Sequence, residues 1–280
     1  MKVLVLGASG LIGTYLSAAL RKRGDTVLNA SLRDPVAAAD AAAGCETIVN
    51  LSGEPLAQRW SSAVKRRIEE SRVEFPRRFL DELATRRVRL SSYVSASAVG
   101  YYGTSETATF DEASPAGSDF LAHVCQGWEA QAMRARELGA RVSMIRSGIV
   151  LARDGGALSK MLPPFRMGLG GIVGSGRQWL SWIHIDDAVG IFLLGVDRVD
   201  GPIDATAPNP VTNADFTHVL GARLGRPTIA PAPTFALRMM LGEGADIVLT
   251  GQRVLPTRAT AEYDYRFAFP TLEAALENLL

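Results

Sequence analysis

The sequence carries the segment VLVLGASGLIG at residues 3–13. Its first four residues are all apolar, as expected for a strand that is buried on both faces of a parallel sheet. Three glycines follow with the spacing GxxGxxG, and apolar residues then recur at helical spacing until Gly24. A strand, a glycine turn and a helix in this order predict a dinucleotide-binding unit at the start of the chain.

Each glycine of this turn has a physical role in such a unit. The first glycine permits a tight turn, the middle one lets the backbone approach a pyrophosphate, and the last one lets the helix pack closely on the strand. The N–H groups and the dipole of the helix N-terminus also favour phosphate. We therefore predict that a cofactor lies against Gly7, Ser9, Gly10, Leu11, Ile12 and Gly13.

The end of the second predicted strand, residues 26–32, discriminates between cofactors. An NAD site usually has a carboxylate here, which accepts a hydrogen bond from the ribose 2′-hydroxyl. Arg33 can instead bind a 2′-phosphate through charge-assisted hydrogen bonds, and Ser31 can add another. We therefore predict NADP, although Asp34 keeps NAD possible and Arg33 could also be an ordinary surface arginine.

Strand and helix patterns alternate through the first half of the chain. Further strands are predicted at residues 47–51, 93–97 and 141–146, and helices at 37–43, 62–84 and 120–138, with Pro76 as a possible kink. Alternation of this kind predicts an α/β fold, a Rossmann-type doubly wound parallel sheet. Ligands of such sheets bind at the carboxyl ends of the strands.

The pattern changes after about residue 152. Residues 155–176 are rich in glycine and predict a substrate-side loop or lid, or else an irregular surface loop. Prolines at positions 227, 231 and 233 mark a second change, and residues 271–280 predict a short amphipathic helix. We expect residues 1–230 to form the cofactor-binding domain, with a smaller substrate-side lobe inserted after 152, and residues 231–280 to form a small closing domain.

Composition narrows the range of partners. The chain has 30 basic and 29 acidic residues, which argues against nucleic acid or an anionic membrane as the main partner. Two cysteines and three histidines show no disulfide or metal-ligand spacing. We see neither a signal peptide nor an apolar run of about 20 residues, so we expect a cytoplasmic protein that acts on a small molecule.

Several motifs resemble the extended short-chain dehydrogenase/reductase superfamily, in particular an atypical epimerase branch. That branch has an NAD-dependent epimerase/dehydratase domain followed by a small domain of unknown function. Besides the glycine turn, the resemblance rests on residues 49–54, 97–103, 119–122, 128–129, 181–187, 206–211 and 251–256. It implies that Leu51, Ser52 and Gly53 lie against the cofactor, and that Gly148 lies near the nicotinamide.

The resemblance fails at one place. Classical members use a serine with a tyrosine and a lysine four residues apart on one helix, often with a glutamate four residues further on. Counting back from Glu129 puts Leu121 at the tyrosine position and Cys125 at the lysine position. Moving the frame by one residue gives Phe120 and Val124, so neither frame contains the pair.

Four residues could replace the missing pair in a catalytic role. Ser97 matches the superfamily's serine, and Tyr101 or Tyr102 could deliver a proton. Asp119 could act as a base or could cap the helix. Two functions stay open: an NADP(H)-dependent oxidoreductase or epimerase-like enzyme acting on an unidentified small molecule, and a non-catalytic NADP(H)-binding redox sensor or interaction protein.

Overall fold

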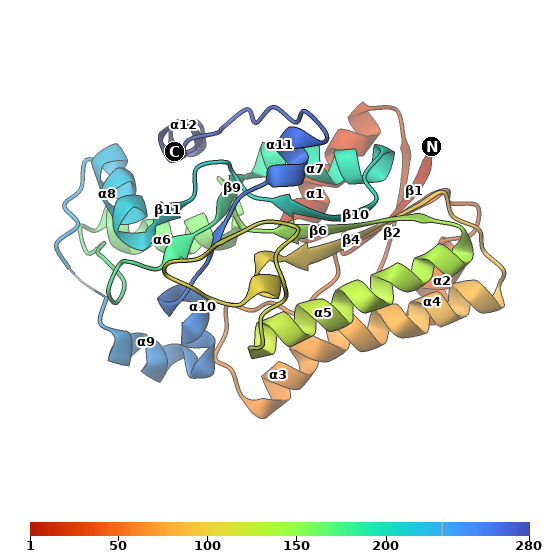
Figure 1. Ribbon diagram of the computed structural model, residues 1–280, viewed down its shortest axis with the longest axis horizontal. Coiled ribbons are helices and arrows are strands. Elements are labelled where there is room, and N and C mark those ends of the chain that lie inside the picture. Colours follow the sequence, from red (N-terminus) through yellow and green to blue (C-terminus); the bar gives the residue numbers. More distant parts are fainter. Residues whose placement is uncertain (231) are drawn as a thin grey trace.

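The computed structural model describes residues 1–230 and 232–280. Its centre is a six-stranded sheet with the order β10-β6-β4-β3-β1-β2, in which all neighbours are parallel (Figure 1). These strands are β1 (Lys2–Leu6), β2 (Thr26–Ala30), β3 (Thr47–Asn50), β4 (Ser92–Ala98), β6 (Arg141–Ser147) and β10 (Gly201–Ala205). The strand order reverses between β1 and β3, so a crevice forms at the carboxyl ends of this pair.

Alternate residues of each strand enter two separate hydrophobic layers. Val3 and Val5 pack in one cluster with α1 (Leu11–Lys22) and α7 (Ile185–Asp197). Leu4 and Leu6 pack in another cluster on the opposite face. That face is covered by α2 (Pro35–Ala41), α4 (Phe75–Thr85) and α5 (Phe120–Met133), which continues as the 3-10 helix η3 (Arg134–Leu138) (Figure 1). Helices on both faces confirm the predicted doubly wound α/β fold.

A third hydrophobic cluster builds the smaller lobe beyond the carboxyl edge. It joins α6 (Gly156–Arg166) to the small strands β7 (Ile149–Ala152), β8 (Trp179–Leu180), β9 (Trp182–His184) and β11 (Val211–Thr212), and to α8 (Asn213–Leu224) and α12 (Leu272–Leu279). Residues 155–176, predicted as a substrate-side loop or lid or else as an irregular surface loop, therefore contain a helix in their first half. Burial of Leu158, Leu162 and Phe165 stabilises a helix there despite its internal prolines.

The long helix predicted over residues 62–84 is interrupted. It consists of α3 (Ser62–Glu69), a π-helical turn η1 (Glu70–Glu74) and α4. Pro76 explains the interruption, since a proline has no N–H group and its ring clashes with the carbonyl four residues earlier, here that of Arg72. The second strand also ends earlier than predicted, at Ala30, so that Arg33 lies in the turn before α2.

Residues 232–280 extend across the molecule. They contain α9 (Thr234–Leu241), the 3-10 helix η4 (Glu243–Ala245), α10 (Asp246–Leu249), β12 (Arg253–Val254), α11 (Thr257–Ala261) and α12 (Figure 1). Strand β12 pairs with β5 (Thr109–Phe110). The carboxylate of Asp187 accepts hydrogen bonds from the amides of Ala268 and Phe269 at 2.8 and 2.9 Å. The domain boundary at 231 remains a prediction, because Pro231 lies outside the described residues.

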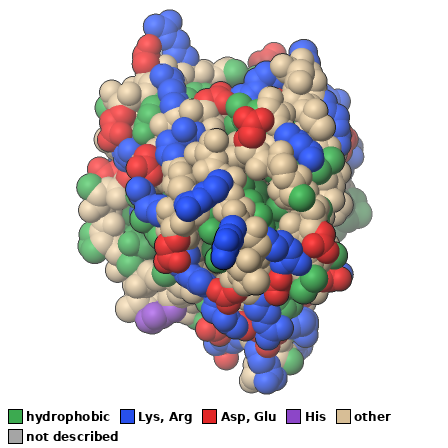
Figure 2. All heavy atoms as spheres, turned by 90° about the vertical axis from the view of Figure 1, so that its right-hand side faces the viewer, with side chains coloured by type: hydrophobic (Ala, Val, Ile, Leu, Met, Phe, Trp, Pro, Cys, Tyr) green, Lys and Arg blue, Asp and Glu red, His purple; other side chains and the backbone are tan. Residues whose placement is uncertain are grey.

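The described surface and helices bear on the expected partners. On the face seen in Figure 2, basic and acidic side chains lie close to one another. Within residues 1–230 and 232–280, no helix combines the length and the apolar sequence that crossing a membrane requires.

Candidate functional site

The glycine turn between β1 and α1 is tightly packed. Gly7 has a φ of +80°, and a β-carbon added to it would lie 2.9 Å from the carbonyl carbon of Leu51. A β-carbon on Gly13 would lie only 2.4 Å from the carbonyl oxygen of Gly7. Both positions therefore require glycine, whereas a β-carbon on Gly10 would stay 3.3 Å from its nearest neighbour.

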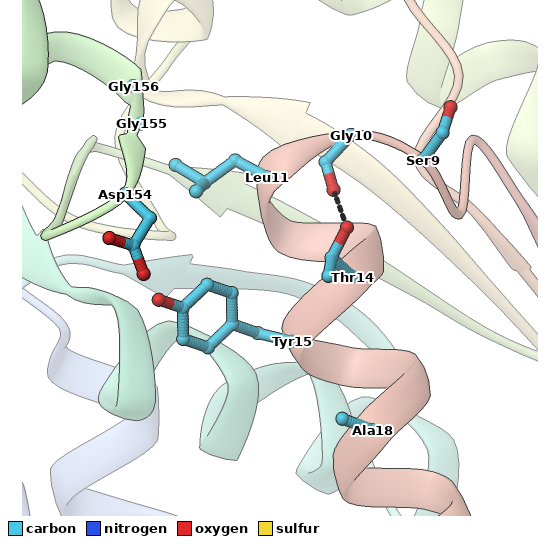
Figure 3. Close-up of a pocket in the computed structure, with 9 residues that line it drawn as sticks. All are labelled: Ser9, Gly10, Leu11, Thr14, Tyr15, Ala18, Asp154, Gly155 and Gly156. Atoms are coloured by element: carbon cyan, nitrogen blue, oxygen red, sulfur yellow. Dashed lines mark hydrogen bonds between the residues drawn. The ribbon is translucent and has the colours of Figure 1, made fainter.

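The first turn of α1 presents backbone donors. Gly10 begins the helix without a side-chain cap, and in the described part of the chain the amides of Leu11 and Ile12 have no acceptor. The hydroxyl of Thr14 donates back to the carbonyl of Gly10 at 3.0 Å, as drawn in Figure 3. This helix end can bind an anionic group such as a pyrophosphate.

An outer pocket of about 580 Å³ lies on one side of this turn. Ser9, Gly10 and Leu11 line it together with Tyr15 and Asp154, and in Figure 3 the Tyr15 ring and the Asp154 carboxylate point toward each other. Burial and the Asp154 charge raise the pKa of Tyr15. The negative charge of the Asp154 carboxylate repels a phosphate group. The outer pocket is therefore less suited to a dinucleotide than the crevice at the carboxyl ends of β1 and β3.

The turn after β2 separates the roles of Arg33 and Asp34. The Asp34 carboxylate accepts the amide of Ala37 at 3.0 Å and thereby caps α2. Arg33 is exposed and forms no ion pair with any described residue. The pKa of the Glu54 carboxyl group is lowered, first by its hydrogen bond from Gln58, with a smaller contribution from the charge of Arg33. Arg33 thus adds positive charge beside the crevice.

The residues after β3 lie between the turn and α5. Leu51 lines a second, central cavity. The amide of Ser52 donates to the Asn50 side chain at 3.1 Å. A β-carbon on Gly53 would lie 2.9 Å from the guanidinium of Arg72. Glycine at position 53 therefore leaves the space that this arginine occupies.

A central cavity of about 560 Å³ lies between the carboxyl ends of the strands and the C-terminal segment. Among the predicted site residues, Ile12, Leu51, Ser97 and Gly148 line it. A β-carbon on Gly148 would lie 2.2 Å from the carbonyl oxygen of Ser181, which explains the glycine. The volume is within the range of small-molecule sites, roughly 300–1,000 Å³.

Ser97 joins this cavity to a buried polar network. Its hydroxyl donates to the carboxylate of Glu129 at 2.7 Å. The guanidinium of Arg146 donates two hydrogen bonds to the same carboxylate, both at 2.8 Å. Since Arg146 and Glu129 are 3% and 8% exposed, the pair satisfies two charges that would otherwise be costly inside the protein.

The structure places Tyr102 in this network and not at the cavity. Its hydroxyl donates to Asp204 at 2.8 Å and accepts from Arg146 at 3.0 Å. Burial raises its pKa, and the side chain is only 3% exposed. This position does not favour the predicted delivery of a proton from Tyr102 to a ligand, which stays a prediction. Tyr101 packs its ring over the Arg146 guanidinium, 3.5 Å away, and does not line the cavity either.

Helix α5 presents an apolar wall where the superfamily has its acid–base pair. Leu121 and Cys125 both line the central cavity. Burial raises the pKa of the Cys125 thiol to about 12, so the thiol stays neutral. The Asp119 side chain accepts the amide of Ala122 at 2.9 Å, which confirms the capping alternative.

Other lining residues escaped the sequence analysis. Arg72 of the π-helical turn donates to the carbonyl of Glu54 at 3.1 Å and lies over the ring of Trp128, 5.1 Å from its centroid. Burial lowers its pKa. Lys65, part of a basic cluster that suggests only a solvated helix face, also lines the cavity and pairs with Glu243 at 2.6 Å. The additional lining residues include Trp60, Phe120, Trp179, Asp246, Ile247 and Gln252.

Comparison with known families agrees with this fold. The family model described as the NAD dependent epimerase/dehydratase family matches residues 3–205. The chain belongs to this family. A second model, a domain of unknown function (DUF1731), matches residues 232–279.

Among named relatives, the chain is similar to the epimerase family protein SDR39U1 of Mus musculus. The two are 38% identical over 296 residues that cover 100% of both chains. A chloroplastic SDR39U1 homolog of Arabidopsis thaliana is 45% identical over 241 residues, covering 84% of this chain and 69% of that protein.

Solved structures show the same similarity. The human epimerase family protein SDR39U1 (isoform2), crystallised with NADPH, is 35% identical and superposes with a TM-score of 0.89, covering 100% of this chain and 99% of that one. MoeE5, in complex with UDP-glucose and NAD, has a TM-score of 0.79 at 18% identity, covering 99% of this chain and 96% of that one. The latter likeness concerns the fold alone.

Proposed function

We propose that the protein binds NADP(H) across the turn from Gly7 to Gly13 and acts on a small molecule as an oxidoreductase or epimerase-like enzyme. The choice of NADP(H) over NAD(H) rests on the different environments of Arg33 and Asp34 after β2. Asp34, the carboxylate that could accept a ribose hydroxyl, caps α2, while the Arg33 guanidinium is exposed for a 2′-phosphate. The human relative crystallised with NADPH supports the same choice.

The residues present fit such a cofactor. Gly7 and Gly13 keep the turn free of side chains, and the amides at the start of α1 can bind the pyrophosphate. When bound, NADP(H) supplies or accepts a hydride. Ser97 and Gly148 line the neighbouring cavity, so we assign the reacting end of the cofactor to that side of the crevice.

Proton transfer has to differ from that of the classical superfamily members. Because the Ser97 hydroxyl donates its proton to Glu129, its oxygen is left to accept a hydrogen bond, and it can orient a substrate hydroxyl. Leu121 and Cys125 offer no acid at the usual place. We therefore expect slow turnover, or a substrate that needs little acid assistance, since such assistance is typically worth about 10²–10⁴-fold.

The test combines binding with turnover. Calorimetry should show NADPH binding about 10- to 100-fold more tightly than NADH, the range of one good charge-assisted contact. A screen of carbonyl compounds should then show NADPH oxidation with at least one of them. Equal affinity for the two cofactors would refute the NADP(H) assignment.

A second function is favoured by one specific observation, the apolar wall that Leu121 and Cys125 build into the cavity. A protein without a proton donor could bind NADP(H) as a redox sensor and contact a partner without turnover. Tight NADPH binding combined with no turnover in the whole carbonyl screen would favour this alternative over the enzyme.

A further inference from the structure

We infer that the central cavity takes a flat, apolar carbonyl compound that carries one carboxylate, and that the Arg72 guanidinium binds this carboxylate. The inference rests on the proposed function, because it names the substrate class of the same site.

The wall of the cavity carries several large aromatic side chains. Three of the four tryptophans of the chain, Trp60, Trp128 and Trp179, line this cavity. Phe120 joins them and meets Trp60 edge to face, with ring centroids 5.5 Å apart. Leu121, Val124 and Ile247 fill much of the remaining wall. Rigid aromatic surfaces favour a ligand with a flat apolar body, which gains contact area without ordering flexible groups.

Each charged group of the wall other than Arg72 has an ion-pair partner or caps a helix. Glu243 binds Lys65 at 2.6 Å, and Asp246 binds Arg238 at 3.0 Å. The third acid, Asp119, is the cap of α5. Of the two cations that line the cavity, Lys65 and Arg72, only Arg72 forms no ion pair with any described residue.

The position of Arg72 is fixed by its neighbours. Its Nη1 donates to the carbonyl oxygens of Glu54 and Ile68, at 3.1 and 3.3 Å, and to the Ser71 hydroxyl at 3.3 Å. The carboxylate of Glu54 is turned away, toward Gln58 and Arg67. The Nε and Nη2 groups have no acceptor in the described part of the chain. A half-buried cation that is held in place and forms no ion pair is suited to an anionic oxygen of a ligand.

Two neutral donors of the wall also lack acceptors. The indole N–H of Trp128 and the hydroxyl of Ser147 are buried and have no hydrogen-bond partner among the described residues. Unpaired buried donors are costly. Both atoms are enclosed, so the donors that an acceptor oxygen of a ligand can reach are the Nε and Nη2 groups of Arg72. A carboxylate and a carbonyl are acceptors only, whereas a sugar hydroxyl brings a donor together with its acceptor oxygen.

The test uses para-carboxybenzaldehyde, its neutral methyl ester and UDP-glucose as probes. Each is titrated into the protein saturated with NADP⁺, so that no reduction occurs, and binding is followed by quenching of the tryptophan fluorescence. We expect the acid to bind at least about 10-fold more tightly than the ester, as one charge-assisted contact would give. UDP-glucose should bind more weakly than the acid.

Arg72→Met should remove the preference for the acid and leave the affinity for the ester and for NADP⁺ within about two-fold. Arg72→Lys should keep a reduced preference, because it retains the charge but not the planar fork. Arg66→Met, at an exposed position of α3, is the matched control and should bind all probes as the native protein does. A melting curve of each variant shows that it is folded.

Three outcomes would overturn the inference. They are equal binding of acid and ester by the native protein, an undiminished preference in Arg72→Met, or a loss of NADP⁺ affinity in Arg72→Met, which would place Arg72 on the cofactor. If Arg72→Met does not fold, the native protein and Arg72→Lys decide the question. Failure of the proposed function is seen separately, as absence of NADP⁺ binding to the native protein.

Discussion

The hydroxyl group of Ser97 donates a 2.7 Å hydrogen bond to the carboxylate of Glu129, and both residues are buried. Ser97 is at the cavity wall, while Glu129 also holds Arg146 in the interior. The polar residue that faces the cavity is thus attached to the main buried ion pair of the protein. Changes at Glu129 should therefore affect both stability and the cavity.

Replacing Glu129 tests this relationship. Glu129→Gln should lower the free energy of unfolding by about 3–5 kcal/mol, because it leaves the Arg146 charge buried and unpaired. Ser97→Ala removes one hydrogen bond and should cost only about 1 kcal/mol. Urea unfolding measures both, with Glu137→Gln at an exposed position as a control that should change little. Equal costs for Glu129→Gln and Glu137→Gln would contradict the view that this pair supports the interior.

Charge reversal at Arg33 tests the cofactor assignment. Arg33→Asp should weaken NADPH binding by about 10- to 100-fold and leave NADH binding equal or tighter, because the charge-assisted contact to the 2′-phosphate is lost. Calorimetry with both cofactors gives the two affinities. Arg66→Asp makes the same charge change at an exposed site of α3 and should leave the preference unchanged. Unaltered selectivity in Arg33→Asp would show that another residue chooses the cofactor.

Two glycines of the turn should respond very differently to alanine. Gly13→Ala puts a β-carbon 2.4 Å from the Gly7 carbonyl oxygen, so the turn must move. We expect a loss of roughly 1–3 kcal/mol in stability and of most NADPH affinity. Gly10→Ala meets its nearest neighbour only at 3.3 Å and should be much milder. Thermal unfolding and calorimetry compare them, and similar losses in both variants would refute the steric argument.

Replacing each of the two tyrosines in the 3-10 helix after β4 should change the free energy of unfolding by different amounts. Tyr102→Phe removes the hydroxyl that binds Asp204 and Arg146, and should cost about 1–3 kcal/mol because both partners are buried. Tyr101→Phe keeps the ring over Arg146 and should be nearly neutral. Chemical unfolding of both variants measures the difference. A stable Tyr102→Phe protein with lost turnover would instead restore Tyr102 to the mechanism.

His184 should make stability depend on pH. Its ring is 1% exposed, its Nδ1 accepts the amide of Asp186, and its Nε2 faces the Asn278 side chain, each at 3.1 Å. Burial lowers its pKa in the folded state. The unfolded chain therefore binds the proton first, and this contribution to stability is present above the ordinary histidine pKa of about 6.5 and lost as the pH falls through it.

Unfolding curves at about pH 7.5 and about pH 5.5 measure this dependence. The native protein should lose more stability on acidification than His184→Gln, in which the group that titrates is absent. His218→Gln, at an exposed position, should behave like the native protein. The same acid-induced loss in native protein and His184→Gln would assign the effect to other groups.

Local patterns were sufficient for the cofactor half of the molecule. The turn from Gly7 to Gly13 could be predicted because its residues are adjacent in sequence and its glycines serve backbone geometry. Apolar patterns typical of strands and of helices alternate along the first half of the chain, and they predicted the sheet because each pattern is also local in sequence. The loss of the acid–base pair at Leu121 and Cys125 could also be seen, since one helix carries both positions.

The cavity could not be predicted in the same way, because its wall comes from residues far apart in the chain. Tyr102 seemed available until Asp204, 102 residues later, was found at its hydroxyl. Arg72 lies four residues before Pro76, in the π-helical turn that this proline causes. The proline was therefore the sequence signal for an irregular backbone at Arg72. The sequence does not show that Gly53 and Trp128 lie beside this turn, so Arg72 could not be assigned to the cavity from the sequence.

The path of residues 232–280 has a consequence for biosynthesis. This segment lines the cavity at Glu243 and Gln252, yet it emerges from the ribosome only after all six strands of the central sheet. The nascent chain can therefore form its dinucleotide crevice while the aromatic cavity is still open to solvent. During that interval Trp60 and Phe120 form an exposed hydrophobic surface, to which a chaperone that recognises apolar segments can bind.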